Sequence, residues 1–173
     1  MHNRPIVITG FMGSGKTSVA RALAHLLHCT AIDLDAEITS TEEHTPAELI
    51  VQSGEAAFRE IETRALQRVL AQGTRVIALG GGAWTVSNNR ELIAGFKCFT
   101  VWLDAPFEAC WKRIASSGGN RPLAPDRQRA ERLYELRRPV YELAKMRIEV
   151  TEELAPHIVA ERVAAQLLRV END

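Results

Sequence analysis

Five short apolar runs are spaced along the chain, and each ends in polar or glycine residues. They are PIVITG, TAIDLD, RVIALG, CFTVWL and MRIEV, which begin at residues 5, 30, 75, 98 and 146. Their length and their content of β-branched and aromatic residues are typical of buried strands. The pattern therefore predicts five strands that are covered on both faces.

Between these runs, apolar residues recur at steps of three or four, as on one face of an amphipathic helix. This spacing predicts helices over residues 18–27, 55–70 and 153–168. Strands that alternate with helices favour a parallel sheet with right-handed crossovers and helices on both faces. We therefore expect an α/β fold whose ligands gather at the carboxyl ends of the strands.

Composition limits the classes of partner. At 173 residues the chain is long enough for one core, so a single domain over residues 1–173 is expected. Its 21 basic and 22 acidic residues give a net charge of −1, which provides no global attraction for nucleic acid or a membrane surface. Cys29, Cys98 and Cys110 fit neither a disulfide framework nor a metal-ligand spacing. With no signal peptide or membrane-length apolar run, we expect a cytoplasmic monomer acting on small molecules.

The stretch GFMGSGKTS, residues 10–18, lies between a predicted strand and a predicted helix. Gly10, four further residues and then Gly15, Lys16 and Thr17 match the phosphate-binding loop of nucleotide-binding proteins. Glycines let successive N–H groups converge on phosphate oxygens, and the helix adds its positive N-terminal end. Lys16 can reach the β- and γ-phosphates, and Thr17 can bind Mg²⁺. The alternative is a glycine-rich turn with a surface lysine, but the four matched positions and their flanks favour a nucleoside triphosphate.

Two carboxylates, Asp33 and Asp35, leave the second apolar run and are expected to point to the same side of an extended chain. Such a pair suits Mg²⁺ ligation through water and removal of a proton from an attacking hydroxyl. The alternative is that Asp35 caps a helix that begins at Ala36. Asp104 ends the fourth run and is a competing Mg²⁺ ligand or a second cap, but the pair favours Asp33.

Two glycine-rich segments are candidates for ligand contact. Gly80, Gly81 and Gly82 end the third run, where three glycines favour a surface that a ligand can approach closely. The segment SSGGNRPLAPD, residues 116–126, is either a plain surface loop or a flap that carries Arg121 over bound phosphates.

Arginines in two predicted helices are candidates for binding an anionic ligand. Arg59 follows Phe58 in a predicted helix, and Arg137 precedes Arg138 in another. A guanidinium is a natural bidentate partner of a carboxylate, and an arginine on a flap can stabilise a transferring phosphoryl group. Each could also be a solvated surface residue, because helical arginines usually are.

The motifs GFMGSGKT, DLD, GEAAFREIE, GGGA, NRPL and RRPVYELA occur in the order and spacing of the shikimate kinases, and together they span nearly the whole chain. The chain therefore resembles that family. The resemblance implies a three-layer P-loop NTPase fold like that of nucleoside monophosphate kinases, with a five-stranded parallel sheet flanked by helices. It places the substrate-binding segment at about residues 33–62 and a lid loop at about residues 114–127. The implied activity is phosphorylation of the 3-hydroxyl of shikimate by ATP, with Mg²⁺ as cofactor.

The resemblance also implies roles for single residues. Those implied to bind ATP are Gly13, Ser14, Gly15, Lys16, Thr17, Ser18, Arg113, which stacks on adenine, and Arg121. The metal would be bound by Thr17, and by Asp33 through water. The residues implied to bind shikimate are Asp35, Phe58, Arg59, Gly80, Gly81, Gly82 and Arg137, with Glu62 in the pocket wall. The catalytic group comprises Asp35 as the base, Lys16 and Arg121.

The chain departs from the family pattern at three positions. Ile50 replaces a common aromatic residue, Thr39 a common acidic residue and Ala124 a second leucine of the lid, so we expect changes in affinity rather than in chemistry. Arg138 competes with Arg137 as the carboxylate partner, and the spacing to the following proline and tyrosine favours Arg137. The remaining alternatives are a kinase for another small hydroxy acid or a nucleoside monophosphate, and a P-loop protein that binds nucleotide without catalysis.

Overall fold

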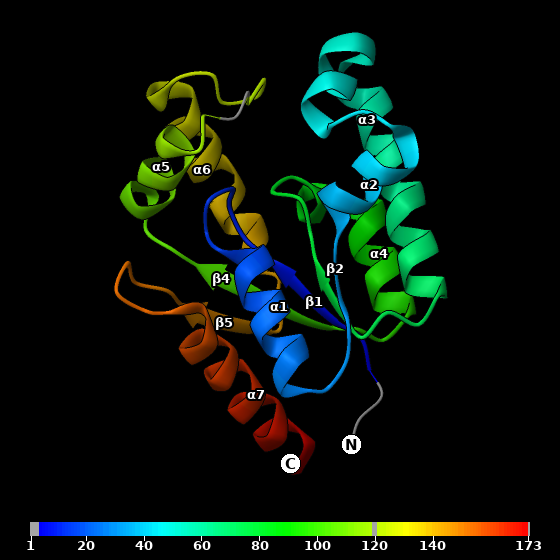
Figure 1. The fold of residues 1–173 in the computed structure, drawn as a ribbon, viewed down its shortest axis with the longest axis vertical. Coiled ribbons are helices and arrows are strands. Elements are labelled where there is room, and N and C mark those ends of the chain that lie inside the picture. The colour runs from blue at the N-terminus through cyan, green and yellow to red at the C-terminus, as the bar shows by residue number, and fades with distance from the viewer. Residues whose placement is uncertain (1–3, 119–120, 173) are drawn as a thin grey trace.

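Figure 1 shows the protein as a computed structural model, which describes residues 4–118 and 121–172. Its sheet has five parallel strands in the order β2-β3-β1-β4-β5. The strands are β1 (Ile6–Thr9), β2 (Ala31–Asp33), β3 (Val76–Ala78), β4 (Phe99–Asp104) and β5 (Met146–Glu149). Each of the five apolar runs coincides with one strand, with β4 extending one residue beyond its run, so the predicted parallel sheet is confirmed.

Helices connect the strands and flank the sheet. They are α1 (Lys16–Leu26), α2 (Leu34–Glu42), α3 (Pro46–Ala71), α4 (Ser87–Gly95), α5 (Phe107–Ser116), α6 (Arg127–Tyr141) and α7 (Pro156–Asn172), with a short 3₁₀ turn, η1 (Ala83–Thr85). In Figure 1, α1 and α7 lie together against the strands, and they are in close contact. The turn η1 contacts α3, α4 and α6, which ties together the helices around the end of β3.

Burial explains why the apolar runs form strands. All residues of β1 and β4 are buried, as expected for the central strands of a sheet that is covered on both faces.

No described helix is long and apolar enough to cross a membrane.

Helix α3 is longer than the spacing of apolar residues predicts. It begins at Pro46 rather than Glu55, because Thr45 and Glu48 form a capping box. Glu48 N donates to Thr45 Oγ1 at 3.2 Å, and Thr45 N donates to Glu48 Oε2 at 2.6 Å. Gly54 interrupts the helix with φ 84° and ψ 164°, so α3 consists of two segments that meet at a kink.

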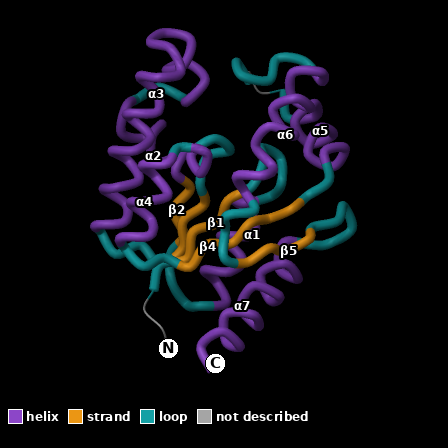
Figure 2. The backbone as a smooth tube through the Cα atoms, turned by 180° about the vertical axis from the view of Figure 1, so that it is seen from behind, coloured by secondary structure: helices purple, strands orange, loops and turns teal. Residues whose placement is uncertain are grey.

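Two helical projections extend beyond the strands. Both views show α3 on one side of the molecule and the pair α5 and α6 on the other (Figures 1 and 2). The predicted lid, about residues 114–127, comprises the end of α5, the connection to α6 and the first residue of α6. Within this prediction, residues 119 and 120 lie outside the described part of the chain.

Candidate active site

The phosphate-binding loop joins β1 to α1 in a conformation that requires glycine. Gly10, Gly13 and Gly15 have φ angles of 142°, 77° and 94°. A Cβ atom at Gly10 would lie 2.7 Å from the carbonyl oxygen of Leu103, and one at Gly13 would lie 2.6 Å from that of Cys110. The loop is therefore packed directly on the backbone of β4 and α5, and α1 starts immediately after it.

Lys16 is buried at the start of α1. Its Nζ donates to the carbonyl oxygens of Gly10 and Phe11 at 2.9 and 2.8 Å. Burial lowers the pKa of Lys16 to about 8, and the nearby charge of Asp35 opposes that shift. The ammonium group is thus held over the loop by backbone carbonyls, where it can exchange these partners for a phosphate oxygen.

An open cavity lies over the loop, and we call it the phosphate cavity. The predicted residues that border it are Gly13, Gly15, Lys16, Thr17, Ser18, Asp33, Asp35, Gly81, Arg113 and Arg121. Ser14 borders instead an adjacent cavity, which runs along residues 150–156. Arg113 borders both cavities and donates from Nη1 to the carbonyl oxygen of Gly13 at 2.9 Å. This position between the loop and the second cavity fits the predicted contact with a nucleotide base.

The two carboxylates after β2 do not lie on an extended chain. Asp33 is the N-cap of α2, because its Oδ1 accepts from Ala36 N at 3.1 Å, whereas Asp35 lies in the first turn of the helix. The predicted extended pair and the alternative of Asp35 as the cap are both wrong. The physical reason is that Leu34 is already helical and fully buried, so the helix begins two residues earlier than expected.

Asp33 and Thr17 provide oxygen ligands at the edge of the phosphate cavity. The Thr17 hydroxyl donates to Asp33 Oδ2 in a short hydrogen bond. A hydroxyl and a carboxylate are hard oxygen donors that suit Mg²⁺, which is commonly held by one or two protein groups together with phosphates and water. Among the described residues, no group of three acidic, histidine or cysteine side chains could hold a metal on its own. The donor set therefore fits Mg²⁺ that arrives with a nucleotide.

Asp35 borders the phosphate cavity and a second cavity, which we call the acceptor cavity. Burial and the charge of Asp33 raise the pKa of Asp35, and Lys16 and Arg121 oppose the shift. A Cβ atom at Gly80 would lie 2.4 Å from Asp35 Oδ1. Glycine at this position is therefore what lets the carboxylate approach the loop after β3.

Residues predicted to bind the substrate converge on the acceptor cavity. They are Asp35, Phe58, Arg59, Glu62, Gly80, Gly81, Gly82 and Arg137, together with Ile50 and Arg121. Sequence reasoning missed Met12, Pro46, Ala47, Pro122 and Leu123, which also border it. The capping box TPAE at residues 45–48 was a signal for the N-terminal segment of α3, whereas no signal indicated the orientation of Met12.

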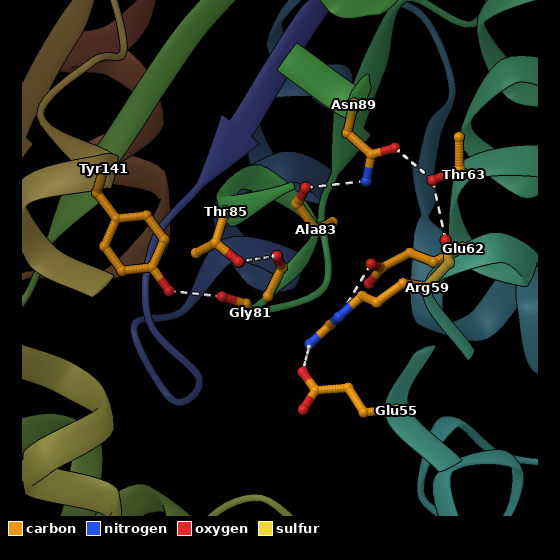
Figure 3. A network of polar contacts seen from close by, with 10 residues as sticks. Glu55, Arg59, Glu62, Thr63, Gly81, Ala83, Thr85, Asn89 and Tyr141 are labelled. Carbon is orange, nitrogen blue, oxygen red and sulfur yellow. Dashed lines mark hydrogen bonds and ion pairs between the residues drawn. The ribbon is translucent and has the colours of Figure 1, made fainter. Parts of the chain in front are cut away.

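Arg59 is held by two acids of its own helix. Its Nη2 donates to Glu55 Oε1 at 2.9 Å and its Nη1 to Glu62 Oε2 at 2.8 Å (Figure 3). Its guanidinium also lies 5.2 Å from the centre of the Phe58 ring. Gly80, Gly81 and Gly82 form a loop after β3 that we call the glycine loop. A Cβ atom at Gly82 would lie 2.2 Å from Arg59 Nη2, so this loop and the guanidinium are in direct contact.

The adjacent arginines of α6 have different partners. Arg137 is buried and borders the acceptor cavity. Arg138 forms two hydrogen bonds with Asp104, at 2.6 and 3.1 Å. Asp104 also accepts from Arg147 Nε at 2.8 Å. Asp104 is therefore an ion-pair centre that does not border the phosphate cavity, which supports the choice of Asp33 as the Mg²⁺ ligand. The interpretation of Asp104 as a helix cap is wrong, because the N-cap of α5 is Pro106.

Two of the positions that depart from the family pattern have structural roles. Thr39 Oγ1 donates to the carbonyl oxygen of Asp35 at 2.8 Å on α2. Ala124 is buried in the connection between α5 and α6 and donates from its N–H to the carbonyl oxygen of Arg121 at 2.8 Å. Ile50 contributes an apolar side chain to the acceptor cavity.

The two cavities adjoin each other, since they share four lining residues, Met12, Asp35, Gly81 and Arg121. A parallel sheet with a phosphate-binding loop after β1, adjoining a small polar cavity, defines a P-loop kinase for a small molecule. The family model for shikimate kinase matches residues 12–169. The chain belongs to the shikimate kinase family.

Individual relatives agree with this assignment. A shikimate kinase from Mesorhizobium japonicum is 40% identical over 92% of this chain and 79% of its own length. One from Ruegeria pomeroyi is 36% identical over 95% of this chain and 85% of its own length.

Solved structures extend the comparison. A shikimate kinase from Acinetobacter baumannii in complex with shikimate is similar with a TM-score of 0.91 and 32% identity, covering 98% of this chain and 96% of that one. A gluconokinase from Sinorhizobium meliloti has a TM-score of 0.68 at 19% identity, covering 98% of this chain and 95% of that one, which is a likeness of fold alone.

Proposed function

We propose that this protein transfers the γ-phosphoryl group of ATP to the 3-hydroxyl of shikimate, giving ADP and shikimate 3-phosphate. The observation that carries the proposal is the position of Asp35. It lies where the phosphate cavity meets a cavity that also contains Arg59 and Arg137. A donor phosphate and a carboxylate-bearing acceptor bound in these two cavities would meet at this side chain.

On the donor side, the phosphates of ATP would bind to the N–H groups of the loop and to Lys16, and Arg121 would approach from the lid. Support comes from the buried Lys16, whose carbonyl partners can be exchanged for phosphate oxygens. Phosphoryl transfer depends mainly on positioning and on compensation of negative charge. Lys16 and Arg121 would supply both the positioning of the phosphates and the positive charge.

Thr17 would hold Mg²⁺ directly and Asp33 would hold it through water. Their contact with each other supports this assignment, since it brings a hydroxyl and a carboxylate to one edge of the phosphate cavity. When bound, Mg²⁺ neutralises charge on the β- and γ-phosphates.

On the acceptor side, Arg59 and Arg137 would bind the carboxylate of shikimate. Both guanidiniums border the acceptor cavity, and Arg59 already interacts with two carboxylates, Glu55 and Glu62. Asp35 would take the proton of the attacking hydroxyl. Its raised pKa favours that role, because a base of higher pKa accepts a proton more readily.

We also propose that the protein acts as a monomer in the cytoplasm. Its three cysteines are all free, and burial raises the pKa of Cys98 and of Cys110 to about 11, so both remain thiols at neutral pH. Such thiols are compatible with a reducing compartment.

The test is a coupled ADP-release assay with shikimate and ATP, with and without Mg²⁺. The wild-type protein should release ADP only when shikimate and Mg²⁺ are both present. Asp35→Asn should lower kcat by about a thousandfold, the order expected for loss of a general base. Calorimetry should show unchanged ATP binding by the variant.

Glu37→Gln is the matched control, because Glu37 lies on the same helix and borders neither the phosphate cavity nor the acceptor cavity. It should leave kcat unchanged. Near-normal turnover by Asp35→Asn would remove Asp35 as the base. Absence of shikimate-dependent ADP release by the wild-type protein would overturn the proposed function itself.

A further inference from the structure

The backbone carbonyl groups of the glycine loop after β3 are all engaged by protein donors. Those of four consecutive residues accept hydrogen bonds: Gly80 from Ala83 N at 3.1 Å, Gly81 from the Tyr141 hydroxyl at 2.5 Å, Gly82 from Thr85 N and Oγ1 at 3.0 and 2.7 Å, and Ala83 from Asn89 Nδ2 at 2.9 Å. The loop is therefore held through its carbonyls, by donors that come from α4, α6 and the loop itself.

The N–H groups of the glycine loop, unlike its carbonyls, have no hydrogen-bond partner among the described residues. Those of Gly80, Gly81 and Gly82 donate to no other residue within the described part of the chain, and the three residues border the acceptor cavity. In a trans peptide the carbonyl and the following N–H point in opposite directions. A donor that holds the carbonyl of Gly81 therefore also fixes the direction of the N–H of Gly82.

Tyr141 is the donor that reaches this peptide from α6. Its side chain is only 1% exposed and is stacked on Trp102, with ring centroids 6.3 Å apart. Burial raises its pKa to about 12, so the hydroxyl keeps its proton at neutral pH and remains a donor. One helical turn earlier on α6 is Arg137, which borders the acceptor cavity. Helix α6 thus carries the Arg137 guanidinium and, through Tyr141, also holds a backbone amide that borders the same acceptor cavity.

A second set of contacts holds the other end of the loop (Figure 3). The Thr63 hydroxyl contacts Asn89 Oδ1 at 2.7 Å and the carbonyl oxygen of Arg59 at 2.9 Å, and Asn89 Nδ2 donates to Ala83. In the figure, Tyr141 approaches the loop from one side, and Thr63 and Asn89 from the other. The chain of contacts joins α3, which carries Arg59, to the glycine loop.

We propose that Tyr141 is a positioning residue for the acceptor site, whose hydroxyl holds the Gly81–Gly82 peptide so that the N–H of Gly82 can donate to an oxygen of the bound acceptor. The glycine loop then acts as a surface of fixed donors, which suits a ligand whose polar groups are hydroxyls and a carboxylate. This inference rests on the proposed function. It adds a residue that touches no reacting atom and holds the glycine loop, while the same side chain also interacts with Arg137.

The test is Tyr141→Phe, which removes the hydroxyl and keeps the ring. Loss of one hydrogen bond and of the backbone geometry that it fixes should raise the KM for shikimate about tenfold, while the KM for ATP stays within about twofold. Calorimetry without nucleotide should show the same weakening of shikimate binding. If Tyr141 had only a structural role, Tyr141→Phe would lower the thermal midpoint but would not raise the KM for shikimate relative to the KM for ATP.

Tyr134→Phe is the matched control. Tyr134 lies on the same helix and donates its hydroxyl to another backbone carbonyl, that of Ala105, at 3.0 Å, outside both cavities. It should leave both KM values unchanged. Equal effects of the two substitutions on shikimate would overturn the inference, because they would report on α6 as a whole.

Thr85→Val provides a second variant that retains the backbone bond from Thr85 N to Gly82. The Thr85 hydroxyl holds the Gly82–Ala83 peptide, which adjoins the Gly81–Gly82 peptide, and one of its two donors remains, so the KM for shikimate should rise less than in Tyr141→Phe, by about threefold. If the wild-type protein phosphorylates shikimate and neither Tyr141→Phe nor Thr85→Val changes its KM, the inference fails and the proposed function stands. If the wild-type protein does not phosphorylate shikimate, the proposed function fails first.

Discussion

Glu62 is a buried acid with an incompletely compensated charge. Its side chain is 1% exposed, and its nearest cation is Arg59 at 2.8 Å. Burial raises the pKa of Glu62 to about 7, the ion pair with Arg59 opposes this shift, and the charge of Asp35 adds to it. The cost of desolvating the carboxylate therefore exceeds the combined attraction of Arg59, which is shared with Glu55, and of Arg137.

This pKa makes the stability of the protein depend on pH. The ordinary pKa of the group is 4.5, so between about pH 4.5 and 7 the folded state binds more protons than the unfolded state. The contribution of Glu62 to the free energy of unfolding is then greatest below that window. It should fall by about 3 kcal/mol as pH rises through 7, and level off above it.

Glu62→Gln should lack this part of the pH dependence. The difference in unfolding free energy, variant minus wild type, should become more positive from pH 5 to pH 8. Urea unfolding at several pH values measures it, and only the difference is used, because Asp35 also titrates with a raised pKa. Parallel curves for the two proteins would contradict the assignment.

At this scale, residue types were predictable and side-chain directions were only partly so. Spacing selected Arg137 over Arg138, and the structure places Arg137 at the acceptor cavity and Arg138 on Asp104. The partner of Arg138 depends on how α6 packs on β4, which a local pattern does not contain. The early turn at Leu34, which separates Asp33 from Asp35, depends likewise on burial of that leucine.

At the scale of elements, the kink of α3 positions part of the acceptor cavity. The segment before Gly54 carries Pro46, Ala47 and Ile50, which border the cavity, and the segment after it carries Arg59. Apolar spacing predicted only the second segment, because the first has one buried side chain, that of Leu49. Its helical start was encoded in a capping box, which is a local signal independent of periodicity.

Gly54→Ala tests whether the kink matters for function. At φ 84° and ψ 164° an L-residue is strained, although no atom lies within 4 Å of the added Cβ. The substitution should lower the unfolding free energy by about 2 kcal/mol and, by shifting the first segment of α3, raise the KM for shikimate several-fold. The KM for ATP should not change.

Gly73→Ala is the matched control for strain alone. Gly73 follows α3, has φ 75° and also has no atom within 4 Å of its added Cβ, but it borders neither the phosphate cavity nor the acceptor cavity. It should lower stability and leave both KM values unchanged. Thermal denaturation and steady-state kinetics of the two variants separate the effects. If both raise the KM for shikimate equally, strain and not the kink is responsible.

At the scale of the whole molecule, the alternation of strands and helices was sufficient to predict the parallel sheet. The strand order β2-β3-β1-β4-β5 is a property of long-range pairing, and no single apolar run encodes it. That order brings β3 beside β1, so the glycine loop after β3 lies next to the phosphate-binding loop after β1. Two motifs that are about 70 residues apart in sequence thus form one site, as expected at the carboxyl ends of parallel strands.

Arg121 connects the two halves of this site from the α5–α6 side. It borders both cavities, and its charge acts on both Lys16 and Asp35. If it stabilises the transferring phosphoryl group, Arg121→Ala should lower kcat by about a hundredfold or more, with a smaller change in the KM for either substrate. Single-turnover kinetics at saturating ATP and shikimate measure the chemical step directly.

Arg129→Ala makes the same change in net charge at an exposed position of α6, where Arg129 pairs only with Asp126 at 3.7 Å among the described side chains. It should not affect kcat, so a loss specific to Arg121→Ala reports on position and not on overall charge. A variant that instead raises the KM for ATP at unchanged kcat would assign Arg121 to binding of the ground state. In that case Lys16, which also borders the phosphate cavity, and Mg²⁺ held by Thr17 and Asp33 would be the groups left to stabilise the transferring phosphoryl group.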